Sequence, residues 1–156
     1  MESDFIYGSH LLTEDEFIRA MEECRYPNAQ FRHADHIRLA WIYLRRYGLR
    51  RAEKRVSETI HRFATSLGHE QKYHGTLTRA WVRLVAVAAH ATPKITAFDE
   101  FISKHAWLLD RSALSAFYSG ACLKTDAARQ GWVEPDKRPL PCAGAECCFD
   151  GAANLR

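Results

Sequence analysis

Residues that end helices divide this chain at short intervals, and their spacing constrains the fold more than any other feature of the sequence. Pro27, Gly48, Gly68 and Pro93 separate stretches in which apolar residues recur every three or four positions. No stretch of useful length alternates apolar and polar residues as a half-buried strand does. Because connections of a few residues force consecutive helices to lie antiparallel, we predict an all-α, up-and-down helical bundle of four to five main helices.

The predicted helices can be placed from their caps and their apolar stripes. Thr13 and Glu16 have the spacing of a capping box, which starts the first helix. The other main helices are predicted over residues 33–47, 51–67, 76–92 and 97–109, and short helical turns over 112–117 and 125–130.

The second predicted helix has one apolar and one charged face. Ile37, Ala40 and Leu44 form its inward line. Asp35 and Arg38 point the other way by the same helical count, so we expect both side chains to face solvent.

The composition changes at Trp132, and this change divides the chain in two. We assign residues 1–132 to a helical bundle domain and residues 133–156 to a C-terminal tail. The first part of the tail contains three prolines and cannot be helical. The second part is rich in glycine and alanine and holds three cysteines: Cys142, Cys147 and Cys148. Their spacing lacks the paired Cys-x-x-Cys of a structural zinc site, so we interpret them as reduced thiols of a loose tail.

Size, composition and charge narrow the class of protein. A chain of 156 residues with 47% hydrophobic and 26% charged residues is typical of one soluble domain. It has no apolar run as long as a membrane span, and its acidic start lacks the order of a signal peptide. We therefore expect a cytoplasmic protein without a membrane partner. The formal net charge of +3 is too small to indicate a nucleic-acid partner.

Three histidines lie where predicted helices begin. His33 and His36 open the second predicted helix, and His74 precedes the fourth. These two helices run in the same direction in an up-and-down bundle, so their starts lie at one end. Helical spacing places both imidazoles of the second helix on or beside its inward face. Imidazole nitrogens suit transition metals, and we predict that His33, His36 and His74 bind a divalent Zn, Fe, Mn or Ni ion.

Further polar groups are expected at the same end of the bundle: His69, Glu70, His105 and Asp110. Glu70 or Asp110 would orient a metal ligand or act as a general base, beside His36 and His74 as catalytic residues. Contacts to the substrate are assigned to Tyr73, Thr78 and Trp81, which flank or follow His74. The metal would activate water or polarise a substrate oxygen, so the chain is a candidate metal-dependent hydrolase, lyase or oxygenase for a small molecule.

Two other functions agree with the sequence. The first is a metal-free enzyme in which His36 or His74, tuned by burial, acts as an acid or a base. The second is a non-catalytic helical module that binds a partner protein or RNA through a basic corner. This corner comprises Arg45, Arg46, Arg50, Arg51, Lys54 and Arg55. Positive charge near a helix C-terminus is also favoured by the helix dipole, so the same run agrees with a solvated corner.

Overall fold

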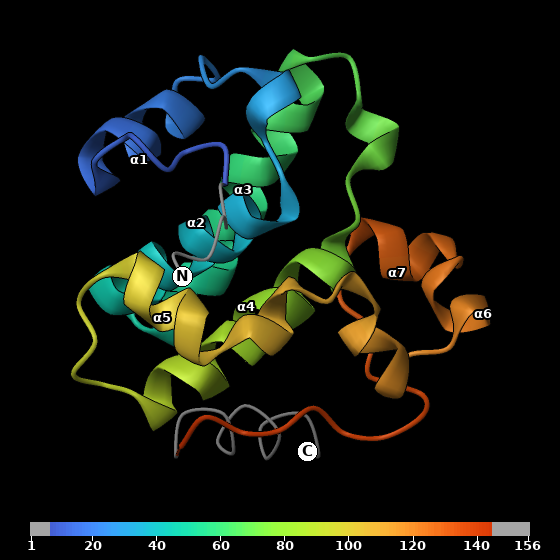
Figure 1. Cartoon of the computed structure of the whole chain (residues 1–156). Coiled ribbons are helices and arrows are strands. Elements are labelled where there is room, and N and C mark those ends of the chain that lie inside the picture. The colour runs from blue at the N-terminus through green and yellow to red at the C-terminus, as the bar shows by residue number, and fades with distance from the viewer. Residues whose placement is uncertain (1–6, 145–156) are drawn as a thin grey trace.

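The computed structural model of the chain describes residues 7–144, which form an all-α structure without strands (Figure 1). The helices are α1 (Glu14–Glu22), α2 (His33–Tyr47), α3 (Leu49–Ser66), α4 (Gly75–Ala91), α5 (Phe98–Lys104), α6 (Gly120–Leu123) and α7 (Asp126–Gln130). Short 3-10 turns join them: η1 (Asn28–Gln30), η2 (Glu70–Lys72), η3 (Ala106–Leu109) and η4 (Arg111–Ala116). The predicted all-α helical bundle is confirmed.

The helix boundaries follow from the caps that the sequence supplies. The Thr13 hydroxyl accepts from the Glu16 amide at 3.2 Å, and the Glu16 carboxylate accepts from the Thr13 amide at 2.9 Å. The expected capping box is therefore present at the start of α1. Gly48 alone separates α2 from α3, with a φ of 78° that glycine adopts without strain. This one-residue junction turns α3 back along α2.

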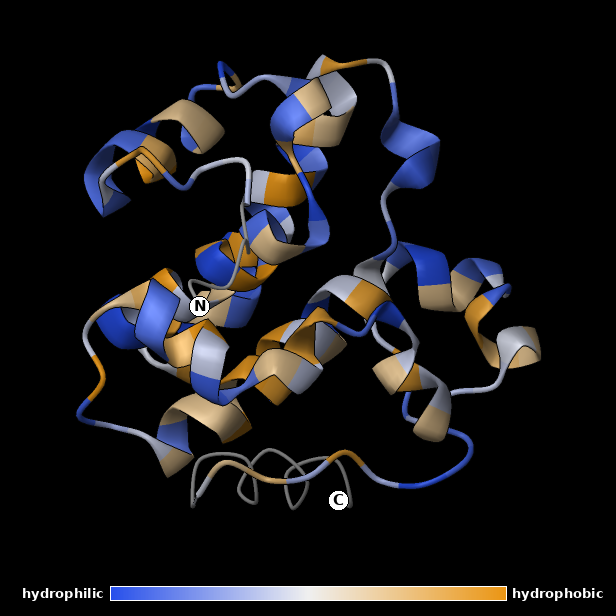
Figure 2. Cartoon of the chain, viewed as in Figure 1, coloured by the Kyte–Doolittle hydropathy of each residue, from blue (hydrophilic) through white to orange (hydrophobic). Residues whose placement is uncertain are grey.

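Three long helices, α2, α3 and α4, pack against one another and form the centre of the molecule. Hydrophobic residues gather along α2 and α4, whereas η2 is hydrophilic (Figure 2). Every residue of α2 from Ile37 to Tyr43 is buried, so this helix is enclosed on nearly all sides. The Trp41 ring stacks on Phe101 of α5 with centroids 5.4 Å apart. Burial of this kind supplies most of the stability of such helices.

The prediction that Asp35 and Arg38 of α2 face solvent is wrong, because both residues are buried. The segment before α1 covers this side of the helix. The Asp35 carboxylate accepts from the amides of Gly8 and Ser9, at 3.1 and 2.7 Å, and also caps its own helix at the Arg32 amide. Arg38 donates to the carbonyl oxygens of Ser9 and Leu12. Helical periodicity describes one helix alone and cannot show that a distant chain segment covers its polar face.

The fifth predicted helix is shorter than expected, and this changes the position of His105. Helix α5 ends at Lys104 and the chain continues as η3. His105 Nε2 lies 2.8 Å from the Thr92 hydroxyl, at the C-terminal end of α4. The prediction that His105 lies beside the starts of α2 and α4 is therefore wrong.

The start of α4 is fixed by the chain that follows α7. The Thr76 hydroxyl donates to the Gly131 carbonyl at 2.8 Å and accepts from the Val133 amide at 3.1 Å. A Cβ atom on Gly75 would lie 2.8 Å from the Gly131 carbonyl oxygen, so this close approach requires glycine. Beyond it, the Tyr118 hydroxyl donates to the Val133 carbonyl at 2.9 Å. Val133, Leu140 and Ala143 of the tail also pack against the core, Cys142 is exposed, and Cys147 and Cys148 lie outside the described residues.

Candidate functional site

His33 lies between the core and the C-terminal half of the chain. Its Nε2 donates to the Leu108 carbonyl at 2.9 Å, and its ring packs edge-on against Trp81 with centroids 4.5 Å apart. Burial lowers the pKa of this imidazole, and the Leu108 contact opposes that effect in part. The ring is therefore neutral at physiological pH and packs as part of the core.

His36 lies deeper in the same region. Its Nε2 is buried and has no hydrogen-bond partner among the described residues. Burial, with a smaller contribution from His33, lowers the pKa of His36 to about 3. The two imidazole centroids are 6.4 Å apart. At neutral pH both rings are uncharged, and both residues are half-buried.

His74 acts as the N-cap of α4. Its Nδ1 accepts from the Leu77 amide at 3.2 Å, so the proton is on Nε2, which donates to the Leu123 carbonyl at 2.8 Å. Both nitrogens are therefore engaged with the backbone, and neither has a lone pair left for a metal. Trp81, which contacts His33, lies two turns beyond His74, or about 10 Å along α4.

The predicted metal ligands are therefore not brought together. Within residues 7–144, no group of three or more His, Cys, Asp or Glu side chains is placed so that it could hold a metal ion. The sequence prediction assumed that α2 and α4 begin level with each other. In the structure the start of α2 faces the middle of α4, since the His33 ring packs on Trp81.

The other predicted site residues are also dispersed. Asp110 is exposed and accepts from the amide and the hydroxyl of Ser112, at 2.9 and 2.6 Å, and these bonds lower the pKa of its carboxyl. Thr78 is buried and donates to the His74 carbonyl at 2.8 Å, while Trp81 is a core residue. Of the predicted catalytic and substrate-binding residues, Glu70 and Tyr73 line one cleft of the described chain.

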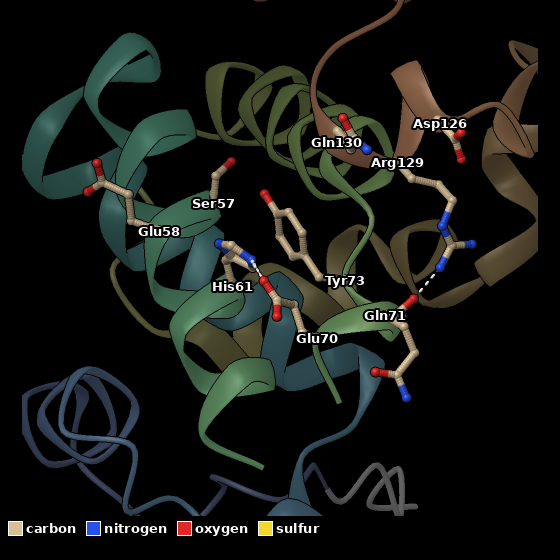
Figure 3. A pocket seen from close by; sticks show the side chains of 9 residues that line it. All are labelled: Ser57, Glu58, His61, Glu70, Gln71, Tyr73, Asp126, Arg129 and Gln130. Carbon is tan, nitrogen blue, oxygen red and sulfur yellow. Dashed lines mark hydrogen bonds and ion pairs between the residues drawn. The ribbon is translucent and has the colours of Figure 1, made fainter. Parts of the chain in front are cut away.

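That cleft has a volume of about 560 Å³ and lies between α3, η2 and α7 (Figure 3). Its lining residues are Ser57, Glu58 and His61 from α3, Glu70, Gln71 and Tyr73 from η2 and its C-cap, and Asp126, Arg129 and Gln130 from α7. A hollow of this size is within the range of small-molecule sites.

A histidine–carboxylate pair lies in this cleft. His61 Nε2 is 3.3 Å from Glu70 Oε1, and the two residues come from different elements (Figure 3). The His61 ring also packs against Tyr73, with centroids 4.6 Å apart and planes inclined by 34°. The side chain of His61 is 48% exposed, so solvent and ligands reach it. The pair therefore combines a fixed ring orientation with access from outside.

The opposite wall of the cleft is held in place by backbone contacts. Arg129 of α7 donates to the Gln71 carbonyl of η2 and so bridges the two sides (Figure 3). The Thr125 hydroxyl caps α7 by accepting from the Ala128 amide at 3.2 Å. Together with the contact between Thr76 and Gly131, these bonds position α7 relative to α3 and α4.

Ser57 has an unusual position in the wall of the cleft. The residue is only 7% exposed, and its Oγ has no hydrogen-bond partner among the described residues. A buried hydroxyl without a partner destabilises the fold by roughly 1–3 kcal/mol relative to one that is hydrogen-bonded. Figure 3 shows this hydroxyl and that of Tyr73 on the same wall of the cleft.

No motif in the sequence singled out His61, Ser57 or Arg129. One signal was available, since Ser57 and His61 lie four residues apart and therefore on one face of a helix. The partner Glu70 follows soon after the end of that helix. The contribution of α7, more than 50 residues further along the chain, had no local signal.

The basic corner is largely occupied by contacts within the protein. Arg45 contacts the Glu14 carboxylate at 3.0 Å and lies over the Trp41 ring, 4.3 Å from its centroid. Arg46 contacts Asp15 at 2.8 Å, and Arg55 lies over the Tyr47 ring. The ion pairs of Arg45 and Arg46 hold α1 against α2, and the contacts together favour the interpretation as a solvated corner.

Comparison of the chain with family models, with curated proteins and with solved structures found no match. None of the helices within residues 7–144 combines the length and the hydropathy needed to cross a membrane. The fold and the cleft therefore define the class: an all-α helical protein with one histidine–carboxylate pair in a polar cleft.

Proposed function

We propose that the protein binds a small polar molecule in the cleft between α3, η2 and α7, and that His61 exchanges a proton with it. The observation that carries this proposal is the contact between His61 and Glu70 in a cleft open to solvent. The small-molecule partner expected from the sequence is kept, and the role expected of His36 or His74 passes to His61.

The chemistry follows from which nitrogen of the ring is used. A carboxylate only accepts, so His61 Nε2 donates to Glu70 and the lone pair remains on Nδ1. That nitrogen is the base. In the proposed role it takes the proton from the bound molecule, while the Glu70 carboxylate contacts the other ring nitrogen. Glu70 is a positioning residue, since it fixes the ring and its tautomer.

His36 and His74 are less suited to this task for separate reasons. His36 Nε2 is buried, and protonation of a buried imidazole is unfavourable. His74 uses both of its nitrogens to hold the start of α4 and the Leu123 carbonyl. Neither imidazole lines the cleft.

The proposal can be tested with a general probe of proton abstraction. A nitrobenzisoxazole opens to a coloured phenolate when a base removes its ring proton, and the absorbance gives the rate. We expect His61→Gln to lower the protein-catalysed rate by at least about tenfold, since a positioned base contributes ~10²–10⁴. Glu70→Gln should lower the rate less, because the base remains and only its orientation is lost.

The matched control is His10→Gln, which removes an exposed histidine outside the cleft. This variant should keep the rate of the parent protein, and circular dichroism should show that all three variants keep their helical content. A His61→Gln variant as active as the parent protein would contradict the proposed role of His61.

A further inference from the structure

The described part of the tail ends beside an exposed histidine of α4. The chain after α7 runs back along the molecule as far as Gly144, next to the C-terminal end of α4 (Figure 1). His90 lies in the last turn of that helix and is exposed. A Cβ atom on Gly144 would lie 3.3 Å from Cε1 of the His90 ring and 3.7 Å from each of its two nitrogens. The imidazole therefore lies directly against the backbone of the tail.

Gly144 is required at this point for two reasons. Its φ is 79°, in the left-handed region that favours glycine, and the chain bends here. The close approach of the His90 ring also leaves little room for a side chain. Because the chain bends instead of running straight on, the residues on both sides of Gly144 stay near the imidazole.

Three cysteines flank this bend in the sequence. Cys142 comes two residues before Gly144 and is exposed, whereas Cys147 and Cys148 come three and four residues after it and lie outside the described residues. A chain spans at most ~3.6 Å per residue, so the Cα atoms of these two cysteines are within about 11 and 14 Å of that of Gly144 in any conformation. Their covalent connection alone therefore keeps the thiols near His90.

A hollow beside His90 provides space for these groups. It has a volume of about 410 Å³ and lies between the junction of α2 with α3, the end of α4 and the tail. Its lining residues are Leu44, Arg45, Gly48, Leu49, Ala86, Ala89, His90, Pro93 and Ala143. None of these described residues carries a carboxylate. A metal ion held at this place would therefore be bound by nitrogen and sulfur, which favours zinc over calcium or magnesium.

We propose that Cys142, Cys147, Cys148 and His90 bind one Zn²⁺ ion. The sequence offers three neighbouring thiols, one fewer than the four ligands of a closed structural zinc site, and the fold supplies an imidazole as the fourth. Three thiolates with one imidazole are an established ligand set for zinc. Two of the four ligands lie within residues 7–144, which agrees with the finding that no group of three is placed to hold a metal ion there.

The zinc site would fasten the tail to the end of α4. This end is opposite to Gly75, which contacts the residue after α7, so the site is separate from the cleft that contains His61. Because the thiols must lose their protons to bind the ion, binding should weaken as the pH falls. The ion would thus add to the stability of the fold, as metal ions that bind only the folded chain do.

The test uses the full chain, reduced and freed of metal with a chelator. Co²⁺ is the spectroscopic probe, since it accepts the same ligands as Zn²⁺ and its absorbance reports them. We expect an equimolar amount of Co²⁺ to give near-ultraviolet absorbance from thiolate ligands and the visible bands of a tetrahedral ion. Zn²⁺ should displace the Co²⁺ and shift the ring resonances of His90.

Two variants test the part of the site that the fold supplies. His90→Ala should lower Zn²⁺ affinity at least about fiftyfold, because one of four ligands is lost. Gly144→Ala keeps all four ligands but places a Cβ against the imidazole, so it should lower the affinity by a smaller factor. The matched controls are His69→Ala and Gly68→Ala, of which the second has a similar φ of 72° but meets nothing within 4 Å. Both controls should keep the affinity of the parent protein.

Cysteine variants test the thiols in the same way. Cys147→Ser combined with Cys148→Ser should abolish the tetrahedral Co²⁺ spectrum. Cys24→Ser combined with Cys122→Ser removes two thiols elsewhere in the chain and should leave the spectrum unchanged. Circular dichroism of the metal-free variants should show the helical content of the parent protein.

Three results would overturn the zinc site. The first is failure of Co²⁺ to bind, or a bound spectrum without thiolate bands. The second is a Zn²⁺ affinity that His90→Ala leaves unchanged, since the thiols would then bind the ion without the fold. The third is loss of the spectrum when Cys24 and Cys122 are replaced. None of these results bears on His61, whose role is tested by proton abstraction.

Discussion

The histidines at the start of α2 and the histidine of the cleft differ in what surrounds the ring. His33 and His36 pack into the core, where their pKa values are lowered by burial. His61 lies at the edge of a hollow, held by one carboxylate and by one aromatic ring. An imidazole near a helix start can thus be packed against other side chains of its own fold and be unavailable to a ligand. An imidazole on an exposed helix face has a ring nitrogen that remains accessible to a ligand.

The largest difference between the two regions should appear when each ring is removed. His33→Ala takes away the ring that packs on Trp81 and leaves the Leu108 carbonyl without its donor. We expect a loss of about 3 kcal/mol in the free energy of unfolding, measured in urea. His61→Ala should cost less than about 0.5 kcal/mol, as is usual for surface positions. Equal losses in the two variants would contradict the division between packed and accessible histidines.

A substitution at Gly75 tests whether the cleft wall depends on the contact between α4 and the residue after α7. A Cβ there would lie 2.8 Å from the Gly131 carbonyl oxygen, so Gly75→Ala should cost about 1–3 kcal/mol. Amide shifts should change in α7 and leave the surroundings of His36 unaffected. Gly120→Ala is the matched control, because a Cβ at Gly120 meets nothing within 4 Å. A neutral Gly75→Ala variant would show that this wall is not held by the close contact.

Acid should destabilise the core region through His36. Its pKa is lowered to about 3 in the folded chain against 6.5 ordinarily, so below pH 6.5 the unfolded state binds one more proton. Stability is therefore complete above this pH and falls by about 1.4 kcal/mol per pH unit as the pH drops from 6.5 toward the folded value. His36→Leu should remove the contribution of His36 to this slope and leave that of His33, measured by urea unfolding at several pH values. A slope unchanged in the variant would mean that other groups cause the acid sensitivity.

The smallest effect is expected at the cleft wall. Ser57→Ala removes a buried hydroxyl that lacks a partner, so the free energy of unfolding should rise by up to about 1 kcal/mol. Thermal unfolding followed by circular dichroism measures this change. Thr59→Ala is the matched control on the same helix, since the Thr59 hydroxyl lies 3.3 Å from that of Tyr43 and its loss should destabilise. Destabilisation in both variants would indicate that Ser57 is satisfied in solution.

The sequence predicted the helices better than the site, and the residues show why. Thr13, Gly48 and Gly68 act locally, so the capping box and two helix ends could be placed from spacing alone. The axial stagger between α2 and α4 depends on how side chains such as Trp81 pack, which no local pattern contains. The domain division at residue 132 remains a prediction.

The same distinction explains the two misplaced charges of α2. Asp35 and Arg38 follow the polar periodicity of a surface helix, and the residues that cover them are 26 to 29 positions earlier in the chain. Likewise, His61 lines a cleft only because α7, which is distant in the sequence, lies opposite α3 in the folded chain. Site residues assembled across such separations require the tertiary structure.

The contacts that residues 7–12 make with Asp35, Arg38 and Asp99 also differ in when their partners are synthesised. The amides of Gly8 and Ser9 bond to Asp35, 27 and 26 residues later in the chain, whereas the Tyr7 hydroxyl donates at 2.8 Å to Asp99, which is synthesised 92 residues later. The first described residues of the chain are therefore held by one partner that is made soon after them and by another that is made much later. The hydrogen bond between Tyr7 and Asp99 of α5 can therefore form only after most of the chain has been synthesised.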